Sequence, residues 1–310
     1  MTDKLVTLIG GGGFLGRYVL QELLKTGTRV RVAQRDPRPA LFLRTQGGLG
    51  QIQFVAADVT KPDTVARAIN GSGAVVNLVG VLAGDFEKVH AVGARTVAEA
   101  AAAAGVGALV HVSAIGADLA SPSHYGRSKA AGEAAVRAAF ANATILRPSI
   151  VFGREDAFLN RFAAMLSKAP IVPVLRAPAR FQPVYVADVA QAVVAALSNP
   201  DDFGGKTFEL GGPDVLTMGA LIRWIAHAVG RTPTIVDLPD PVGGLLASLG
   251  FLPGAPITKD QWQMLQADTV VTGPDGLAAL GIAPTPLDSV APAWLVRYRR
   301  HGRFATKVAA

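Results

Sequence analysis

A short apolar run near the start of the chain leads directly into a glycine-rich turn and then into a helical pattern. Residues Leu5–Ile9 have the aliphatic character of a buried strand, and helical periodicity follows over Leu15–Lys25. Between them, three glycines are spaced as GxxGxxG, which allows a tight turn and a close approach of backbone amides to a phosphate. The helix N-terminus adds unpaired donors that attract anions. This order predicts a dinucleotide site whose contacts are Gly10, Gly13, Phe14, Leu15, Gly16 and Arg17.

Strand and helix patterns alternate through the first half of the chain. Strands are predicted at Leu5–Ile9, Arg29–Ala33, Ile52–Ala56, Ala74–Leu78, Ala108–Val112 and Thr144–Leu146. Helices are predicted at Leu15–Lys25, Pro62–Ile69, Phe86–Ala104 and Tyr125–Phe140. Because strands joined through helices pair in parallel, the predicted fold is α/β, a Rossmann-type doubly wound parallel sheet.

The pattern changes after Arg147, where prolines become frequent and loops lengthen. We therefore expect two domains: residues 1–150 form the NAD(P)-binding Rossmann domain, and residues 151–310 form a smaller C-terminal substrate domain. The chain is expected to revisit the sheet near Val184–Leu197, so the two domains are interleaved.

Composition excludes several classes of function. The chain has no cysteine, which rules out disulfides, thiolate catalysis and cysteine zinc sites. Its five histidines show no metal-binding spacing, so no metal site is predicted. Neither a secretory signal nor an apolar run of about 18 residues occurs, and no transmembrane helix is predicted. With 6% aromatic residues and no interleaving of basic and aromatic side chains, nucleic-acid binding is not expected.

Much of the net charge of +7 lies at the C-terminal end. The cations that follow the last acid, Asp288, are Arg297, Arg299, Arg300, Arg303 and Lys307. A basic tail of this kind can contact nucleic acid, an anionic membrane surface or an acidic partner, or it is simply a solvated end. The sequence leaves these readings open.

The end of the second strand bears on the choice of dinucleotide. An acid there would bind the ribose hydroxyls of NAD, whereas arginine accommodates the 2′-phosphate of NADP. This chain has Arg35 at that position, with Arg17 at the start of the preceding helix, and this favours NADPH. If Arg35 instead pairs with Asp36 or faces solvent, NAD(H) remains an alternative. Asp58 and Val59, after the third strand, are expected at the adenine edge.

A serine, a tyrosine and a lysine follow in an order that suits hydride-transfer chemistry. Ser113 ends the fifth strand, and Tyr125 and Lys129 form a YxxxK whose spacing places both side chains on one helix face. A lysine ammonium lowers the pKa of a neighbouring phenol and holds the nicotinamide ribose, while a serine hydroxyl positions a carbonyl oxygen. These three residues are the candidate catalytic set.

With these motifs the chain resembles an extended or atypical short-chain dehydrogenase/reductase. The motifs that carry the resemblance are the glycine turn with Gly13–Val19, Asn77–Gly80, Ser113, Tyr125, Lys129, Leu146–Pro148, Phe152–Phe162, Gln182–Val186 and Asp188-Val189. Within that family it is similar to the NADPH-binding accessory subunit of respiratory complex I, the alpha subcomplex subunit 9 family. The resemblance implies cofactor contacts from Val79, Gly80 and Pro148.

The same resemblance implies a role. The chain would be an accessory or assembly subunit that binds NADPH as a structural cofactor, contacts other complex I subunits, and lies on the cytoplasmic face of a bacterial inner membrane. One residue departs from the family pattern: where extended dehydrogenases carry an asparagine in a proton relay, this chain has His90. We expect His90 to be a partly buried histidine bonded to a carbonyl. The alternative function is an NADPH-dependent oxidoreductase or epimerase that acts on a carbonyl, alcohol or sugar-like substrate through Tyr125.

Overall fold

The computed structural model describes residues 5–250, 252 and 257–302, which fall into two compact units. The first unit runs up to Pro148 and also takes Val186–Leu210 and Thr272–Ala283. The second unit takes Ser149–Tyr185, Gly211–Val271 and the described residues from Pro284 onward. The chain therefore passes between the units several times.

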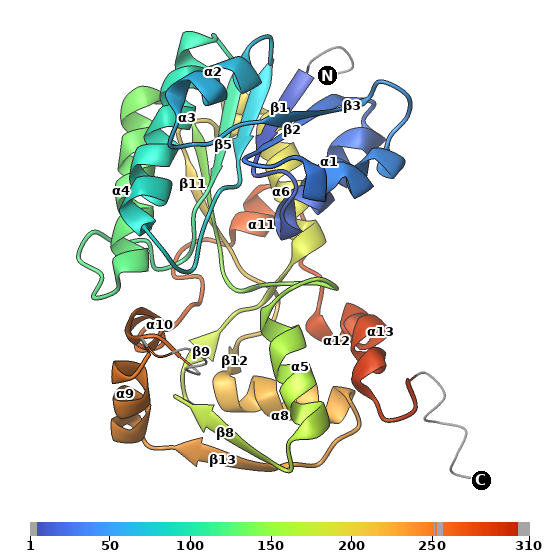
Figure 1. Ribbon diagram of the computed structural model, residues 1–310, viewed down its shortest axis with the longest axis vertical. Coiled ribbons are helices and arrows are strands. Elements are labelled where there is room, and N and C mark those ends of the chain that lie inside the picture. Colours follow the sequence, from blue (N-terminus) through green and yellow to red (C-terminus); the bar gives the residue numbers. More distant parts are fainter. Residues whose placement is uncertain (1–4, 251, 253–256, 303–310) are drawn as a thin grey trace. The chain divides into compact units, whose positions relative to one another are not determined.

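The first unit is built on a parallel sheet with the strand order β11-β6-β5-β4-β1-β2-β3 (Figure 1). Its strands are β1 (Leu5–Ile9), β2 (Arg29–Gln34), β3 (Ile52–Ala56), β4 (Ala74–Asn77), β5 (Ala108–Val112), β6 (Thr144–Pro148) and β11 (Thr207–Leu210). The strand order reverses between β1 and β4, the place where sheets of this kind bind ligands beyond the carboxyl ends of their strands. The Rossmann-type fold is confirmed, with β11 as a seventh strand that the sequence did not reveal.

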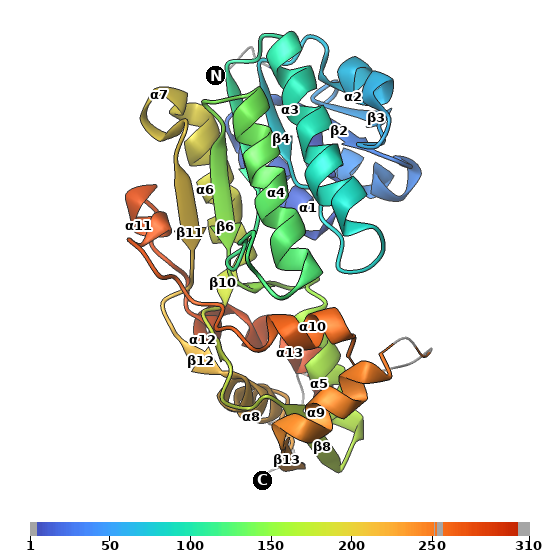
Figure 2. The same cartoon turned by 90° about the vertical axis from the view of Figure 1, so that its left-hand side faces the viewer.

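Helices cover both faces of this sheet. Helices α1 and α6 pack together on one face, while α2, α3 and α4 lie on the other (Figure 2). The helices of this unit are α1 (Phe14–Lys25), η1 (Arg38–Gln46), α2 (Pro62–Ile69), η2 (Glu87–Val92), α3 (Gly93–Ala103), α4 (His124–Ala139), α6 (Val186–Ser198), α7 (Pro200–Phe203) and α11 (Gly276–Ala279). The helix predicted at Phe86–Ala104 is divided, because η2 is a π-helix that continues into α3. The chain returns to this unit first as α6 and later as α11.

The central strands are buried along their whole length. Every residue of β4 and β5 is buried, which is the pattern of parallel strands with helices on both faces. Two polar residues are buried with them, Asn77 and His111, and they hydrogen-bond to each other. The sheet is therefore a rigid base whose carboxyl-terminal edge carries the candidate site.

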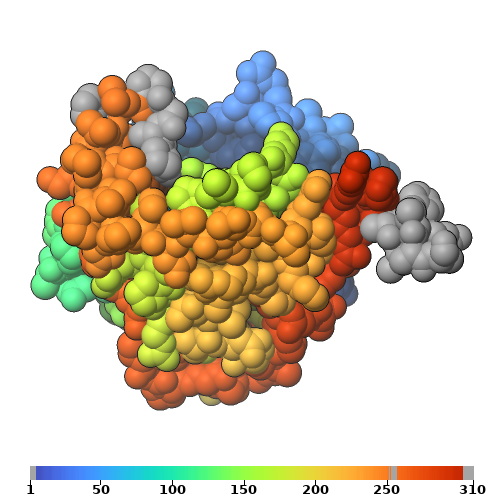
Figure 3. All heavy atoms as spheres, turned by 90° about the horizontal axis from the view of Figure 1, so that it is seen from below, coloured from blue at the N-terminus to red at the C-terminus, as the bar shows by residue number. Residues whose placement is uncertain are grey.

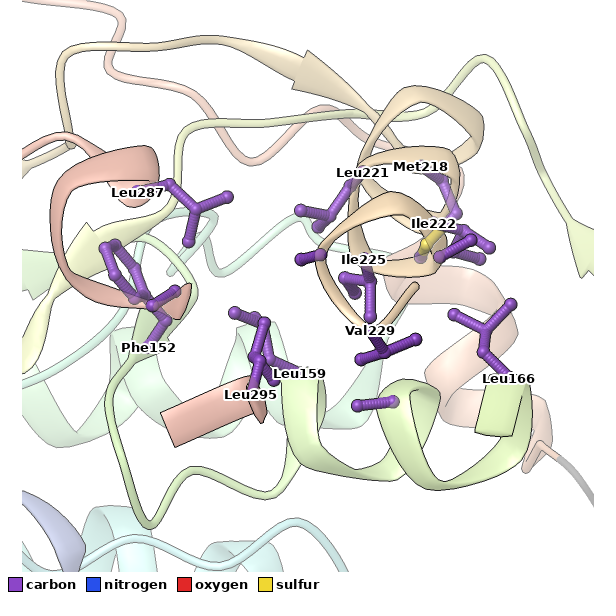
Figure 4. Packing of buried hydrophobic residues seen from close by; sticks show 14 of the residues in the cluster. Phe152, Leu159, Leu166, Met218, Leu221, Ile222, Ile225, Val229, Leu287 and Leu295 are labelled. Carbon is purple, nitrogen blue, oxygen red and sulfur yellow. The ribbon is translucent and has the colours of Figure 1, made fainter. Parts of the chain in front are cut away.

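The second unit has its own hydrophobic core, formed between helices α5 and α8 (Figure 4). Leu159 and Leu166 of α5 face Leu221 and Ile225 of α8, and Leu295 joins them. The elements of this unit are β7 (Val151–Phe152), α5 (Phe158–Lys168), β8 (Ile171–Leu175), β9 (Arg180–Phe181), β10 (Val184–Tyr185), β12 (Leu216–Thr217), α8 (Met218–Ala228), β13 (Thr234–Leu238), α9 (Asp240–Ser248), α10 (Lys259–Met264), α12 (Leu287–Val290), α13 (Pro292–Leu295) and η3 (Val296–Tyr298). Its strands pair as β7 with β10, β9 with β12, and β8 with β13.

Part of the surface of the second unit is apolar. Helix α9 exposes Val242 and Leu245, and β13 exposes Val236. The part of the chain that includes α9 and β13 is orange in Figure 3. No helix within the described residues is long and apolar enough to cross a membrane. Those residues also contain no group of three or more histidine or acidic side chains that could hold a metal ion.

The basic C-terminal end is held in part by this unit. Arg297 donates a hydrogen bond to Oδ1 of Asn160 at 2.6 Å, and Arg299 donates one to the carbonyl oxygen of Ala228 at 2.9 Å. Arg303 and Lys307 lie outside the described residues. At least two of the cations predicted to form a tail are therefore engaged by the fold itself.

Candidate functional site

The glycine turn after β1 has the geometry of a phosphate cradle. Gly10 has a φ of +84°, which favours glycine, and a side chain there would press on Val79 after β4. At Gly16, a Cβ atom would collide with the backbone of Gly11. Glycine is therefore required at both positions, one for the turn and one for the approach of α1 to the strand.

The N-terminus of α1 is open to an anion. Its N-cap residue is Gly13, no side chain caps the first amides, and no acid lies in the first turn. A Cβ atom at Gly13 would approach only the carbonyl oxygen of Gly10, at 3.3 Å, so the backbone there faces open space. Exposed amides at the positive end of a helix fit a pyrophosphate, and these residues suit the dinucleotide that the sequence predicts.

Arg35 does not pair with Asp36. The carboxylate of Asp36 instead accepts hydrogen bonds from the backbone amide of Arg38 at 3.1 Å and from its guanidinium, with Nε at 2.9 Å and Nη2 at 2.8 Å. Arg35 is exposed just beyond the end of β2, where its charge contributes to lowering the pKa of Asp58. The Asp36–Arg38 pair thus removes one of the two alternatives for Arg35, and the solvent-facing alternative stays open.

The other residues predicted around the adenosine differ in what they offer. The guanidinium of Arg17 lies over the ring of Phe42, 5.0 Å from its centre. Asp58 accepts hydrogen bonds from the amide and hydroxyl of Thr60, and these bonds, mainly the one from the amide, lower its pKa. Val59 is buried and packs against Gly93, so its side chain belongs to the core.

The ends of adjacent strands bring further predicted residues together. Val79 and Gly80 follow β4, Ser113 follows β5, and Pro148 ends β6, and these three strands are neighbours in the sheet. The Ser113 side chain is buried, and its Oγ has no hydrogen-bond partner in the described part of the chain. A buried hydroxyl left unpaired is costly, and a ligand oxygen at this edge would satisfy it.

Tyr125 and Lys129 lie on the first turns of α4, beside these strand ends. The ring of Tyr125 is flanked edge-to-face by the rings of Phe86 and His90, with centres 6.0 and 5.4 Å away. Desolvation by this environment raises the pKa of Tyr125 to about 12, although the residue is only half-buried. The pKa of this phenol is therefore raised, not lowered by the lysine as the sequence led us to expect.

Lys129 is buried against the sheet, where Nζ donates a hydrogen bond to the carbonyl oxygen of Val112 at 3.2 Å. Burial lowers its pKa to about 8, opposed by the charge of Glu133 one turn later on the same helix. A Cβ atom at Gly80 would lie 3.5 Å from Nζ, so the loop after β4 passes directly over the ammonium group.

This lowered pKa predicts how stability depends on pH. Between pH 8 and the ordinary lysine pKa of 10.5, the unfolded chain retains a proton on Lys129 that the folded chain has released, so stability rises with pH. The rise is at most about 3 kcal/mol, from about 1.4 kcal/mol per pKa unit. Urea unfolding without added nucleotide from pH 7 to 9, below the titration of tyrosine near pH 10, should show this slope in the wild type and not in Lys129→Met. Parallel pH profiles for the two proteins would contradict the assignment.

Sequence reasoning missed a partly buried ion pair between Arg147 and Glu133, which lies one turn after Lys129 on α4. Arg147 on β6 donates two parallel hydrogen bonds to Glu133 on α4, from Nε to Oε1 at 2.8 Å and from Nη2 to Oε2 at 2.6 Å. Glu209 of β11 approaches the same arginine at 3.9 Å. The i, i+4 spacing of Lys129 and Glu133 was the available signal, since it places the two side chains on one helix face.

His90 differs from its expected environment. The side chain is buried, and it bonds to the amide of Val81 and the hydroxyl of Ser128 rather than to a carbonyl oxygen. Burial and the charge of Lys129 lower its pKa to about 4. His90 is therefore a neutral imidazole held between the loop after β4 and helix α4.

Comparisons with known proteins agree with this geometry. Residues 6–211 match the model of the NAD dependent epimerase/dehydratase family. The chain is 37% identical to the mouse (Mus musculus) mitochondrial NADH dehydrogenase [ubiquinone] 1 alpha subcomplex subunit 9, over 99% of the chain and 84% of the relative. It is 32% identical to the ceramide reductase of Caulobacter vibrioides, over 76% of the chain and 74% of that protein.

Solved structures share the fold at lower identity. The NADPH-dependent quinone oxidoreductase of Escherichia coli, solved with NADPH, has a TM-score of 0.73 and 21% identity, covering 94% of this chain and 99% of that one. At this level of identity the similarity extends to the fold alone.

Proposed function

The chain belongs to the NAD dependent epimerase/dehydratase family, and from this premise we propose that it is an NADPH-binding accessory or assembly subunit of respiratory complex I. Gly10, Gly13 and Gly16 would hold the pyrophosphate, and Arg35 the 2′-phosphate. The cofactor would be structural: bound to stabilise the unit rather than turned over. We expect the protein on the cytoplasmic face of a bacterial inner membrane, in contact with complex I subunits.

The observation that carries the proposal is the match to alpha subcomplex subunit 9, which extends over nearly the whole chain. The mouse and Arabidopsis thaliana proteins of that name are 37% and 34% identical, over 99% and 96% of this chain. Since the similarity runs through both units, it supports a shared role rather than only a shared cofactor domain.

The state of the catalytic set supports a structural cofactor. Hydride transfer to a carbonyl needs a proton donor that can be recharged from solvent. With a pKa of about 12 Tyr125 carries a proton at physiological pH, but both nitrogens of His90 are already engaged, so His90 offers no path by which a phenolate would regain its proton. A relay through the position of the family asparagine is therefore not supported.

A second candidate function is an NADPH-dependent oxidoreductase or epimerase. It is favoured by the complete set of Ser113, Tyr125 and Lys129, and by the unpaired Oγ of Ser113, which would suit a substrate oxygen. The relative named ceramide reductase indicates that close members of the family carry out reduction. In this reading Tyr125 would donate the proton to a carbonyl, alcohol or sugar-like substrate.

Co-purification and turnover distinguish the two functions. A tagged full-length chain, expressed in its own organism, should recover complex I subunits from solubilised membranes, and Tyr125→Phe should recover them equally. Neither protein should oxidise NADPH steadily with aldehydes, ketones, ceramides, quinones or sugar nucleotides. The phenylalanine variant keeps the ring between Phe86 and His90 and loses only the hydroxyl. Steady turnover that Tyr125→Phe abolishes, with no complex I subunits in the eluate, would establish the oxidoreductase instead.

The preference for NADPH is tested at Arg35. Replacing it with alanine should weaken NADPH binding by about 10- to 100-fold, because a charge-assisted contact to the phosphate contributes about 1.5–3 kcal/mol. NADH, which lacks the 2′-phosphate, should bind both proteins alike. Titration calorimetry with both nucleotides measures the difference, and Arg29→Ala, at the opposite end of β2, is the matched control. Equal affinities of the wild type for NADPH and NADH would refute the preference.

A further inference from the structure

The imidazole of His90 joins two elements that border the candidate site. His90 lies on the π-helix η2 and is only 2% exposed. Its Nε2 accepts a hydrogen bond from the amide of Val81, in the loop after β4, at 2.9 Å. Its Nδ1 lies 2.9 Å from Oγ of Ser128 on α4. One side chain therefore connects that loop to the helix that carries Tyr125 and Lys129.

The hydrogen bonds determine where the imidazole proton lies. The hydroxyl of Ser128 donates its one proton to the carbonyl oxygen of Tyr125 at 2.9 Å, so it accepts from His90. The amide of Val81 occupies the lone pair on Nε2, which leaves the proton on Nδ1. Since both nitrogens are used and the side chain is buried, the ring neither gains nor passes on a proton at physiological pH. The ring therefore acts by holding the neighbouring groups in place.

The surroundings of the ring hold it in one orientation. Phe86 stacks on it with ring centres 5.6 Å apart and planes 11° from parallel, and Tyr125 meets it edge-to-face. A side chain at Gly132 would collide with the carbonyl oxygen of His90, so η2 and α4 are in backbone contact. The π-helical turn lies at this contact, and turns of that kind are frequently functional.

The loop that His90 holds passes over the lysine. A Cβ atom at Gly80 would be 3.5 Å from Nζ of Lys129 and 3.9 Å from Nε2 of His90. A shift of Val81 away from His90 would therefore carry Gly80 away from Lys129. We expect the distance between Gly80 and Nζ of Lys129 to determine the space available to a ligand at the carboxyl end of β4.

We propose that His90 is a positioning residue for the nicotinamide half of the cofactor, which it serves by fixing the loop Val79–Val81 against helix α4. The inference rests on the proposed binding of NADPH. The adenosine half is assigned to other elements, the glycine turn and Arg35 at the end of β2, and does not depend on this contact. His90 therefore affects one end of the dinucleotide selectively.

The test compares the binding of NADPH with the binding of a ligand that has only the adenosine half. NADPH and adenosine 2′,5′-bisphosphate, which lacks the nicotinamide ribose, are titrated into the full-length wild type and His90→Leu. Loss of two hydrogen bonds, each contributing about 0.5–1.5 kcal/mol, should weaken NADPH binding by about fivefold or more. The bisphosphate should bind both proteins equally. His90→Gln, whose amide offers one donor and one acceptor, should restore most of the NADPH affinity.

A second variant protects the test against a failure of His90→Leu to fold. Ser128→Ala removes one of the two bonds and should show the same selectivity with a smaller loss, about threefold for a bond of about 0.7 kcal/mol. Equal losses for the two ligands, or no loss for either, would overturn the positioning role. A wild type that binds the bisphosphate and NADPH with no benefit from the nicotinamide half would also overturn it. Failure of the wild type to bind either ligand would instead refute the proposed function.

Discussion

Replacing Gly13 with leucine is expected to abolish dinucleotide binding and leave the fold intact. The backbone at Gly13 has a φ of −76°, which any residue adopts, and a Cβ atom there meets only the carbonyl oxygen of Gly10. The new side chain would fit the protein and would project into the place of the pyrophosphate. Loss of several charge-assisted hydrogen bonds of about 1.5–3 kcal/mol each should weaken NADPH binding by at least about 100-fold.

Thermal unfolding with increasing NADPH measures this effect. A ligand that binds only the folded state at 100 times its Kd stabilises it by about 2.7 kcal/mol, and Gly13→Leu should lose that gain. Gly273→Leu is the matched control, because no atom lies within 4 Å of a Cβ atom there. Gly16→Ala should behave in the opposite way, with a lowered Tm even without ligand. A Gly13→Leu protein that kept the full NADPH-induced shift would show that this turn does not hold the cofactor.

Breaking the partly buried pair between Arg147 and Glu133 should cause the largest loss of stability. Arg147→Met removes the partner of a carboxylate whose side chain is only 9% exposed; because the arginine side chain itself is 26% exposed, the loss should fall at or below the lower end of the about 3–5 kcal/mol that breaking a fully buried pair costs. The pair also connects α4 to β6, so removing it should also shift Lys129, which lies on α4. Chemical denaturation at pH 7 measures the change in the free energy of unfolding.

Two further variants separate the pair from general effects of charge removal. The double variant Glu133→Leu/Arg147→Met removes both charges and should recover most of the loss, since apolar replacements of a buried pair are often nearly neutral. Lys25→Met breaks an exposed pair with Glu22 in the same unit and should change stability by less than about 1 kcal/mol. A loss in Arg147→Met no greater than that in Lys25→Met would contradict the importance of the partly buried pair.

The parts of the fold that were predictable are those encoded by neighbouring residues. The turn after β1 combines a strand, glycines and a helix within about twenty residues, and its geometry follows from local rules. The YxxxK spacing places Tyr125 and Lys129 on one helix face for the same reason. Strand β11 could not be found in this way. Thr207–Leu210 is short, lies at the sheet edge, and pairs with β6 some sixty residues earlier.

The features of the site that the sequence did not predict depend on burial and on contacts between distant elements. The raised pKa of Tyr125 results from desolvation by the packed fold, whereas the YxxxK pattern suggested only the effect of lysine. The pairing of Asp36 with Arg38 rather than Arg35 depends on the turn into η1. The bonds that fix His90 come from Val81 and Ser128, which are 9 and 38 residues away along the chain. Sequence spacing does not encode such contacts.

The repeated passage of the chain between the units bears on the order in which the protein can fold during synthesis. The first unit is not complete when Pro148 emerges, because its seventh strand and helix α11 come from Thr207–Leu210 and Gly276–Ala279. The segment Ser149–Tyr185 of the second unit is therefore synthesised before the dinucleotide-binding unit can complete its sheet, and most of the second unit is synthesised before that unit receives α11. The exposed edge of β6 must wait for β11, and unpaired edges are sites of aggregation. Because each unit is made of three separate segments of the chain, neither unit can be produced by cutting the gene at a single point.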